Sequence, residues 1–298
     1  MKGDLVSWSR RNWLRRCAAL VVAGAVIPEA LATRDAMGTK ELEKERRLRF
    51  AITFSNPMSR VLTKQKFWMY MPVRETATQR LLDLQVSTNH QMHEDSFGHA
   101  LLEIPFDDFP PLAQKVVTIS LLLKVSAKSR SVSLSGNWLS AERYIESDDP
   151  RIKALAGELR RRNEWETARA IYDWVAGNLS YAGYLADDYG ALYALIERKG
   201  DCTEYAYMLV ALARACGIPA RMAGGYVVDR DTMPRAEDYH NWAELHVDGS
   251  WHLMDAQKKN WLAPAEQYIA FRYYRADAHN QLESAHRFRM DGELNIRI

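Results

Sequence analysis

The chain has 298 residues, of which 47% are hydrophobic and 26% are charged, an ordinary composition for a globular protein with a substantial core. The formal net charge is +2, but the first 32 residues alone carry +3, so the rest of the chain is close to −1. Because phosphate binding needs clustered lysine and arginine, this balance argues against nucleic acid as a partner.

The N-terminus has the three parts of an export signal. A basic stretch precedes an apolar run over residues 18–27, and Ala30-Leu31-Ala32 has the form that signal peptidases cut. The basic stretch Ser9-Arg10-Arg11-Asn12-Trp13-Leu14-Arg15 is similar to the bacterial twin-arginine signal, with a Sec signal or an uncleaved anchor as alternatives. We expect residues 1–32 to be a signal peptide of a periplasmic or secreted protein. The apolar run is too short to span a bilayer as a permanent helix, and we expect no stable membrane insertion after cleavage.

A charged connection and a β-rich region follow. Residues 40–47 are dense in charge and indicate a solvated helix or linker, so we assign residues 33–48 to a linker. Short runs rich in β-branched and aromatic residues then alternate with turn formers, which predicts a small antiparallel, sandwich-like N-terminal domain over residues 49–140. The expected strands are residues 49–55, 66–71, 81–87, 100–104 and 116–125.

One cluster in this β-rich region contains potential metal ligands: His93, Glu94, Asp95 and His99. A metal site needs ligands that converge in space, and this local spacing does not show convergence. No calcium-loop pattern or cofactor motif is apparent elsewhere. We therefore expect an exposed turn here, and a protein that uses neither metal nor cofactor.

The hydrophobic period becomes helical after Asp149-Pro150. Apolar residues recur every three or four positions as far as Leu179 and predict one or two amphipathic helices, and residues 192–196 predict another short helix. A longer helix is expected from Asp201 or Cys202 to Cys216, where Gly217 ends it.

Antiparallel strands are expected after this helix. Residues 220–228, 242–247 and 251–255 alternate in the manner of strands, and Asp248-Gly249 supplies a hairpin turn between the last two. An order of helices followed by antiparallel strands indicates an α+β domain over residues 141–298.

Cys202 lies at the N-terminal end of the longer helix. A helix N-terminus lowers the pKa of a thiol through the macrodipole and the free backbone N–H groups. The only other cysteine after the signal segment is Cys216. At opposite ends of one helix the two would be about 21 Å apart, whereas a disulfide needs Cα atoms within roughly 7 Å. We therefore expect Cys202 to be a free, nucleophilic thiol and Cys216 to be a core residue.

His240 and Asp255 complete a candidate triad. A nucleophilic thiol needs an imidazole as base and a third group that holds the imidazole. His240 and Asp255 fall at comparable distances from the hairpin turn, so we expect them to be cross-strand neighbours. His246 and His252 lie closer to the turn without a matching carboxylate, and we expect both on the surface.

Several blocks of this half resemble the bacterial transglutaminase-like family, in order and spacing, over about residues 150–265. The blocks are Gly200-Asp201-Cys202-Thr203-Glu204-Tyr205-Ala206, Leu212-Ala213-Arg214-Ala215-Cys216-Gly217-Ile218-Pro219-Ala220-Arg221, Gly224-Gly225-Tyr226, His240-Asn241-Trp242-Ala243-Glu244 and Trp251-His252-Leu253-Met254-Asp255. The β-rich segment resembles, more weakly, the N-terminal domain often attached in such proteins. One departure is Ala256, where the family usually has proline.

The resemblance implies a papain-like or transglutaminase-like core, in which a helix bearing Cys packs on an antiparallel sheet bearing His and Asp. It implies that Cys202 is the nucleophile, His240 the general base and then acid, and Asp255 the orienting residue. The expected activity is thiol-dependent acyl transfer on a peptide or protein substrate through a thioester, as in a cysteine protease, an amidase or a transglutaminase.

Three further residues are candidates for supporting roles. The tetrahedral oxyanion needs preorganised donors, and we expect the Cys202 N–H and the Tyr181 side chain, although core packing is the alternative for Tyr181. Trp242 and Glu244 are expected to support the site, the indole by packing beside the sheet and the carboxylate by pairing with Arg221. Four aromatic residues either wall the cleft or fill the core: Tyr268, Phe271, Tyr273 and Tyr274.

Two other readings remain. An NlpC/P60-type cell-wall amidase also has Asp-Cys at a helix start, but the block from Arg214 to Arg221 and an aspartate as third residue favour the transglutaminase-like reading. A catalytically silent binding scaffold is the second alternative. Such scaffolds tend to lose a triad residue, and all three are present in this chain.

Overall fold

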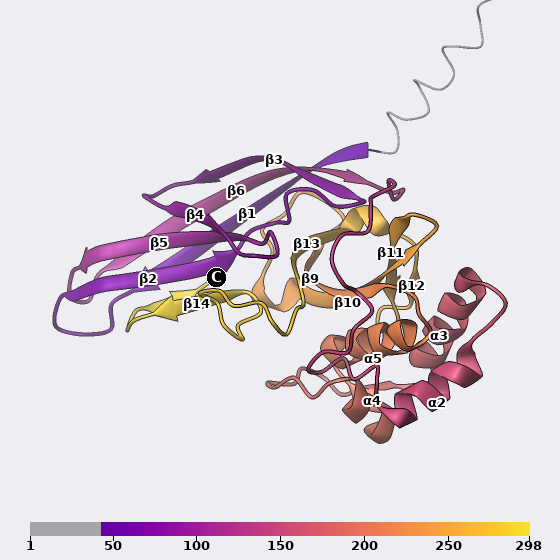
Figure 1. Ribbon diagram of the computed structural model, residues 1–298. Coiled ribbons are helices and arrows are strands. Elements are labelled where there is room, and N and C mark those ends of the chain that lie inside the picture. The colour runs from indigo at the N-terminus through magenta and orange to yellow at the C-terminus, as the bar shows by residue number, and fades with distance from the viewer. Residues whose placement is uncertain (1–42) are drawn as a thin grey trace, which may run out of the picture. The chain divides into compact units, whose positions relative to one another are not determined.

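The computed structural model describes residues 43–298, so the signal-peptide prediction lies outside the described residues. Figure 1 shows the arrangement of strands and helices. The strands are β1 (Glu43–Ser55), β2 (Leu62–Tyr70), β3 (Gln79–Val86), β4 (Gln91–Glu94), β5 (Ala100–Phe109), β6 (Gln114–Ser126), β7 (Ser180–Tyr181), β8 (Lys199–Gly200), β9 (Ala220–Val227), β10 (Tyr239–Val247), β11 (Ser250–Asp255), β12 (Asn260–Trp261), β13 (Tyr268–Tyr273), β14 (Phe288–Asp291) and β15 (Asn295–Arg297). The helices are α2 (Pro150–Leu159), α3 (Glu164–Asn178), α4 (Ala191–Glu197) and α5 (Cys202–Ala215), with short 3-10 turns η1 (Ala236–Asp238) and η2 (Ala265–Gln267).

Strands β1 to β6, together with β14 and β15 from the end of the chain, form two four-stranded sheets. Their orders are β15-β1-β6-β3 and β14-β2-β5-β4. All five strands expected here are present, and the structure adds β4. Alternate residues of β1 are buried against a shared core, because successive side chains of a strand point to opposite faces. The inward series of β1 is Leu48, Phe50, Ile52 and Phe54.

The linker expected at residues 33–48 is wrong for residues 43–48, which open strand β1. Their partner is the end of β6, in the register Glu43↔Ser126. The charged side chains of this stretch are mostly exposed, while Arg46 is buried. A charge run on the solvent side of a strand has the same composition as a charged linker, so composition alone did not distinguish them.

The expected boundary at residue 141 also fails at the C-terminus. Strand β14 pairs with β2, and β15 pairs with β1, so the last residues of the chain belong to the N-terminal sheets. Figure 1 shows the yellow β14 running beside the purple β2. These strands have four and three residues, too few to give a period-2 pattern that a sequence reading detects.

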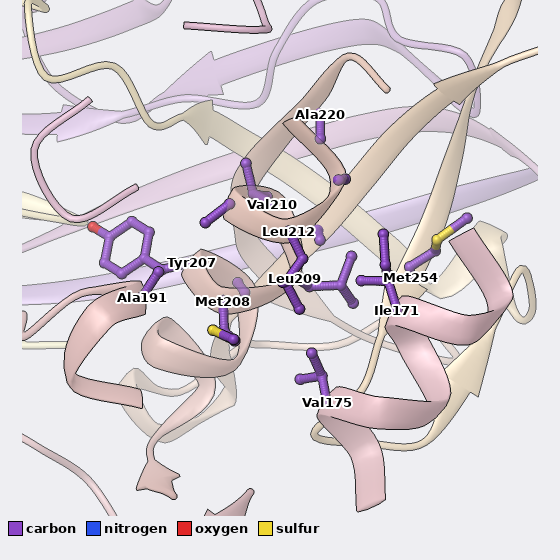
Figure 2. Close-up of a cluster of buried hydrophobic side chains, with 14 of the residues drawn as sticks. Ile171, Val175, Ala191, Tyr207, Met208, Leu209, Val210, Leu212, Ala220 and Met254 are labelled. Carbon is purple, nitrogen blue, oxygen red and sulfur yellow. The ribbon is translucent and has the colours of Figure 1, made fainter. Parts of the chain in front are cut away.

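The second half is an antiparallel sheet of order β12-β11-β10-β9-β13 with α5 packed on β9 and β10. Two helices, α2 and α3, are present over the range expected to hold one or two. Helix α5 is buried on all sides because α2, α3 and α4 enclose it together with the sheet. Figure 2 shows its side chains meeting Ile171 of α3 and Met254 of β11. In residues 43–298, no helix combines the length and apolarity that a membrane span needs.

The hairpin between β10 and β11 turns at Asp248-Gly249, as expected, with Val247 paired to Ser250. Asp248 has φ 49° and Gly249 has φ 75°. A two-residue turn with positive φ at both positions matches the twist of the flanking strands. This turn fixes the strand register that places His240 of β10 relative to Asp255 of β11.

Candidate active site

Helix α5 begins at Cys202 because a capping box closes its N-terminus. The Thr203 N–H donates to Asp201 Oδ1 at 2.7 Å, and the Asp201 N–H donates to Glu204 Oε2 at 3.1 Å. Gly200 makes room for this arrangement, since a Cβ there would lie 2.4 Å from Glu204 Cβ. Cys202 therefore occupies the first helical position, where its backbone N–H has no partner within the helix.

His240 and Asp255 lie side by side on β10 and the end of β11. His240 Nε2 is 2.7 Å from Asp255 Oδ2, and both side chains are buried. The strand register places Asp255 diagonally across from His240, because Ala243 pairs with Met254. A carboxylate only accepts hydrogen bonds, so Nε2 carries the proton and Nδ1 is the acceptor nitrogen of the neutral ring.

Two further donors hold Asp255, and sequence reasoning did not find them. The Tyr268 hydroxyl donates to Asp255 Oδ2 at 2.8 Å, and the Lys258 N–H donates to Oδ1 at 3.0 Å. Asn260 Nδ2 in turn donates to the Tyr268 oxygen at 2.6 Å. The carboxylate is thus oriented although the residue after it is Ala256, where proline is usual.

Cys202 and His240 line one cavity of about 1350 Å³. Asn241 Nδ2 donates to Thr203 Oγ1 at 3.0 Å, which joins the residue after His240 to the residue after Cys202. The Cys202 thiol is half-buried and makes no hydrogen bond with the His240 ring among residues 43–298. Catalytic hydrogen bonds are often long before substrate binds, so shared lining of the cavity is the relevant relationship.

The pKa of Cys202 differs from the expectation for a helix N-terminus. Burial of the thiol, reinforced by the adjacent Asp201 carboxylate, raises its pKa to about 12. The Asn241 backbone N–H and the Thr203 hydroxyl act in the opposite direction and do not offset burial. The expectation of a lowered pKa is therefore wrong: the resting thiol keeps its proton, and a base must remove it.

Tyr181 lies at the cavity rather than in the core, so the core-packing alternative is wrong. It is in β7, which pairs in parallel with β8 and sets Tyr181 opposite Gly200. Its side chain is 58% exposed and lines the cavity that holds Cys202. The position suits an oxyanion donor beside the Cys202 N–H.

Trp242 and Glu244 lie outside the cavity lining. Trp242 is 1% exposed and packs edge-on against Tyr268, with ring centroids 5.1 Å apart. Glu244 Oε2 pairs with Arg221 at 2.6 Å, the partner expected from sequence. The Arg221 guanidinium stacks 3.6 Å from the Tyr273 ring centroid. Trp242 therefore touches the site through Tyr268, and Glu244 stabilises the sheet beside it.

The other histidines named from sequence are not part of this site. His246 and His252 are half-buried, rather than on the surface, and contact the Val132 and Val247 carbonyl groups. His93 lies in β4, not in a turn, and pairs with Glu103 at 2.7 Å. The remaining member, His99, pairs with Asp95 at 2.8 Å.

The cavity wall also contains residues that the sequence did not single out. Asp188 Oδ2 accepts from the Tyr207 hydroxyl at 2.9 Å and lies 3.1 Å from His286 Nε2. Arg272 of β13 lines the same cavity. Of the four aromatic residues considered, Tyr273 and Tyr274 line the cavity, whereas Tyr268 and Phe271 do not. These wall residues come from distant segments, so no local motif marks them.

A family profile and one solved structure agree with this fold. Residues 153–256 match the profile of the transglutaminase-like superfamily, a range that contains Cys202, His240 and Asp255. A candidate cysteine protease from Cytophaga hutchinsonii is similar in structure, with a TM-score of 0.58 and 20% identity over 86% of this chain and 90% of that chain. The periplasmic domain of TgpA from Pseudomonas aeruginosa has a TM-score of 0.34 and 16% identity over 70% of this chain and 87% of that chain. No curated protein matches the sequence.

Proposed function

This chain carries a transglutaminase-like domain within residues 153–256, and from that premise we propose that it is a thiol-dependent acyl-transfer enzyme. Its substrates are amide bonds of peptide-like molecules, and its intermediate is a thioester on Cys202. The observation that carries the proposal is the buried His240–Asp255 pair, which opens onto the same cavity as a thiol at a helix N-terminus.

The first step is attack on the substrate carbonyl. Because Nε2 donates to Asp255, His240 Nδ1 accepts the thiol proton as the Cys202 sulfur bonds to the carbonyl carbon. The carbonyl π electrons move to oxygen, and the oxyanion is stabilised by the Cys202 N–H and the Tyr181 hydroxyl. Asp255 favours this step because it accepts a hydrogen bond from the imidazolium as it forms.

The second step releases the amine and resolves the thioester. The Nδ1 proton passes to the leaving nitrogen, the C–N bond breaks and an acyl group remains on sulfur. Water or an amine then attacks the thioester carbon while Nδ1 takes its proton. The C–S bond breaks, the acid or the new amide leaves, and the proton passes from Nδ1 to sulfur to restore the thiol. Hydrolysis gives a protease or amidase, and attack by an amine gives a transglutaminase.

The N-terminal segment supports the further proposal that the enzyme acts in the periplasm or outside the cell. Residues 18–32 have the apolar run and cleavage form of a signal peptide. Expression of the full chain in a bacterium, with fractionation and N-terminal sequencing, tests this. We expect a periplasmic or secreted product that begins at residue 33, and an uncleaved cytoplasmic product would refute export.

Trapping the thioester tests the enzyme proposal. Purified protein is mixed with isolated cell-wall peptides, or with a glutamine-containing protein plus an amine donor. The reaction is quenched in acid, and the mass of the protein is measured by mass spectrometry. We expect turnover and an acyl adduct on Cys202, retained in Cys216→Ala and lost in Cys202→Ala. Cys216 is the matched control because its thiol is buried against the Ala156 carbonyl group. Turnover that persists in Cys202→Ala would refute the thioester route.

A further inference from the structure

Arg272 is a buried cation without a hydrogen-bond partner at two of its nitrogens. Arg272 is 6% exposed and lines the cavity that holds Cys202. Its Nε and Nη2 atoms are buried and have no hydrogen-bond partner among residues 43–298. Leaving a guanidinium unpaired away from water is costly, so buried arginines are normally paired. An unpaired one in a cavity wall indicates that its partner arrives with a ligand.

Asp188, a carboxylate in the same cavity wall, already has two other partners. Asp188 accepts from the Tyr207 hydroxyl at 2.9 Å and pairs with His286 at 3.1 Å. Burial opposes ionisation of Asp188, and the His286 hydrogen bond, with a smaller contribution from the Arg272 charge, lowers its pKa. Arg272 makes no hydrogen bond with Asp188 or His286 among residues 43–298. The Arg272 guanidinium thus has the Tyr239 hydroxyl as a hydrogen-bond partner, while its Nε and Nη2 atoms stay unpaired.

The strand pairing places Arg272 across β9 from Asn241, the residue after His240. The pairing of β13 with β9 shifts between Ala270 and Arg272, so Arg272 lies opposite Gly224. A Cβ at Gly224 would lie 2.3 Å from the Tyr239 hydroxyl, so the glycine leaves room for that ring. Burial raises the pKa of Tyr239, and the charge and hydrogen bond of Arg272 act in the opposite direction.

We propose that Arg272 binds a carboxylate of the substrate, so that the acyl group delivered to Cys202 comes from a peptide-like molecule with a free carboxylate near the reactive amide. This rests on the proposed function and names its substrate class. A guanidinium presents parallel N–H donors that match the two oxygens of a carboxylate. The carboxylate is either the α-carboxylate of a chain end or the side chain of an acidic residue.

Three isosteric alkylating reagents separate these sources. Iodoacetyl-glutaminamide is neutral, iodoacetyl-glutamine carries the α-carboxylate, and iodoacetyl-glutamic acid α-amide carries the γ-carboxylate. Each forms a C–S bond to Cys202 with loss of iodide, and the thiol proton passes to His240. The rate of Cys202 modification is followed by mass spectrometry in the Cys216→Ala background, at one pH and one salt concentration.

We expect one anionic reagent to react at least about tenfold faster than the neutral one, as a charge-assisted hydrogen bond provides. If the α-carboxylate reagent reacts fastest, the substrate carboxylate is that of a chain end. If the γ-carboxylate reagent reacts fastest, it is that of an acidic side chain. The preference should fall to about one in Arg272→Gln and persist in Arg287→Gln, a matched control because Arg287 lines the same cavity and donates to the Ala236 carbonyl group.

The comparison of the three reagents needs no change at Arg272, so a folding defect in Arg272→Gln does not weaken the test. Equal rates for all three reagents would overturn the proposal, as would a preference that survives in Arg272→Gln. The neutral reagent reports on the proposed function separately. If it labels Cys202 rapidly in a His240-dependent manner while the anionic reagents gain nothing, the enzyme proposal stands and only the carboxylate site falls.

Discussion

Asp255 Oδ2 receives two hydrogen bonds, one from His240 Nε2 at 2.7 Å and one from the Tyr268 hydroxyl at 2.8 Å. Tyr268 itself is fixed by Asn260 and by the packed ring of Trp242. The orientation of the proposed base, His240, therefore depends on a tyrosine that does not line the cavity. Tyr268 is a positioning residue.

Tyr268→Phe should lower kcat/KM by about fivefold to tenfold, because Asp255 loses one of the donors that orient it, while the net loss of stability is about 1 kcal/mol. The matched control is Tyr205→Phe, which removes a hydroxyl that donates to the Leu179 carbonyl group at 2.6 Å in the core. Steady-state kinetics and urea unfolding of both variants check this. A similar loss of kcat/KM in Tyr205→Phe would indicate a general structural effect instead.

Tyr181→Phe should reduce kcat by about tenfold to a thousandfold, the usual consequence of removing one oxyanion donor. Its effect on the alkylation of Cys202 should be small, because alkylation forms no oxyanion. Tyr184→Phe is the control, since Tyr184 lines the same cavity and is 84% exposed. If Tyr181→Phe keeps full turnover, the second donor lies elsewhere.

Gly200→Ala should destabilise the protein by about 1–3 kcal/mol, because the added methyl meets Glu204 Cβ at 2.4 Å inside the capping box. Gly157→Ala is the opposite case: Gly157 lies in the exposed interior of α2 and nothing lies within 4 Å of the new Cβ. That variant should gain about 0.5–1 kcal/mol from helix propensity. Urea unfolding of both variants measures the difference, and an unchanged Gly200→Ala would show that the cap rearranges freely.

Glu204 should make stability fall as pH rises. Burial of its side chain raises its pKa to about 7, so the folded state binds a proton that the unfolded chain has released above its ordinary pKa of 4.5. The stabilisation is complete below that value and is lost as pH rises through about 7, a loss of roughly 2 kcal/mol between pH 5 and pH 8. Glu204→Gln mimics the protonated carboxyl and should flatten this dependence. Parallel pH slopes for the two proteins in urea unfolding would contradict the assignment.

The elements that carry the site were predictable because their signals are local. The expected helix start at Asp201 or Cys202, the helical period of α5 and the Asp248-Gly249 turn are each marked by residues close together in the sequence. Together they set the helix, the register and the hairpin. The resemblance to the transglutaminase-like family then supplied the roles of the triad. The pKa of Cys202 was not predictable, because the degree of burial at the helix start depends on the loops that cover it.

What the sequence missed depends on contacts between distant segments. Tyr268 opens β13, which β9 and β10 separate from β11 in the sheet, and its contact with Asp255 arises only in the folded chain. In the sequence it looks like any core aromatic. Arg272 is notable for the partner it lacks, which no local pattern records. The return of β14 and β15 to the first two sheets has the same origin, since three or four residues take their conformation from the strand edge they meet.

The most direct test of the catalytic assignment is the pH dependence of iodoacetamide alkylation of Cys202, measured in Cys216→Ala with and without His240→Ala. A thiol whose pKa is raised to about 12 reacts slowly at pH 7 unless a neighbouring base accepts its proton. We predict rapid labelling near neutral pH with His240 present, and a loss of at least about a hundredfold at pH 7 in His240→Ala, recovered as pH rises. Superimposable profiles for the two proteins, or labelling no faster than that of free cysteine, would contradict the assignment of Cys202 and His240 as nucleophile and base.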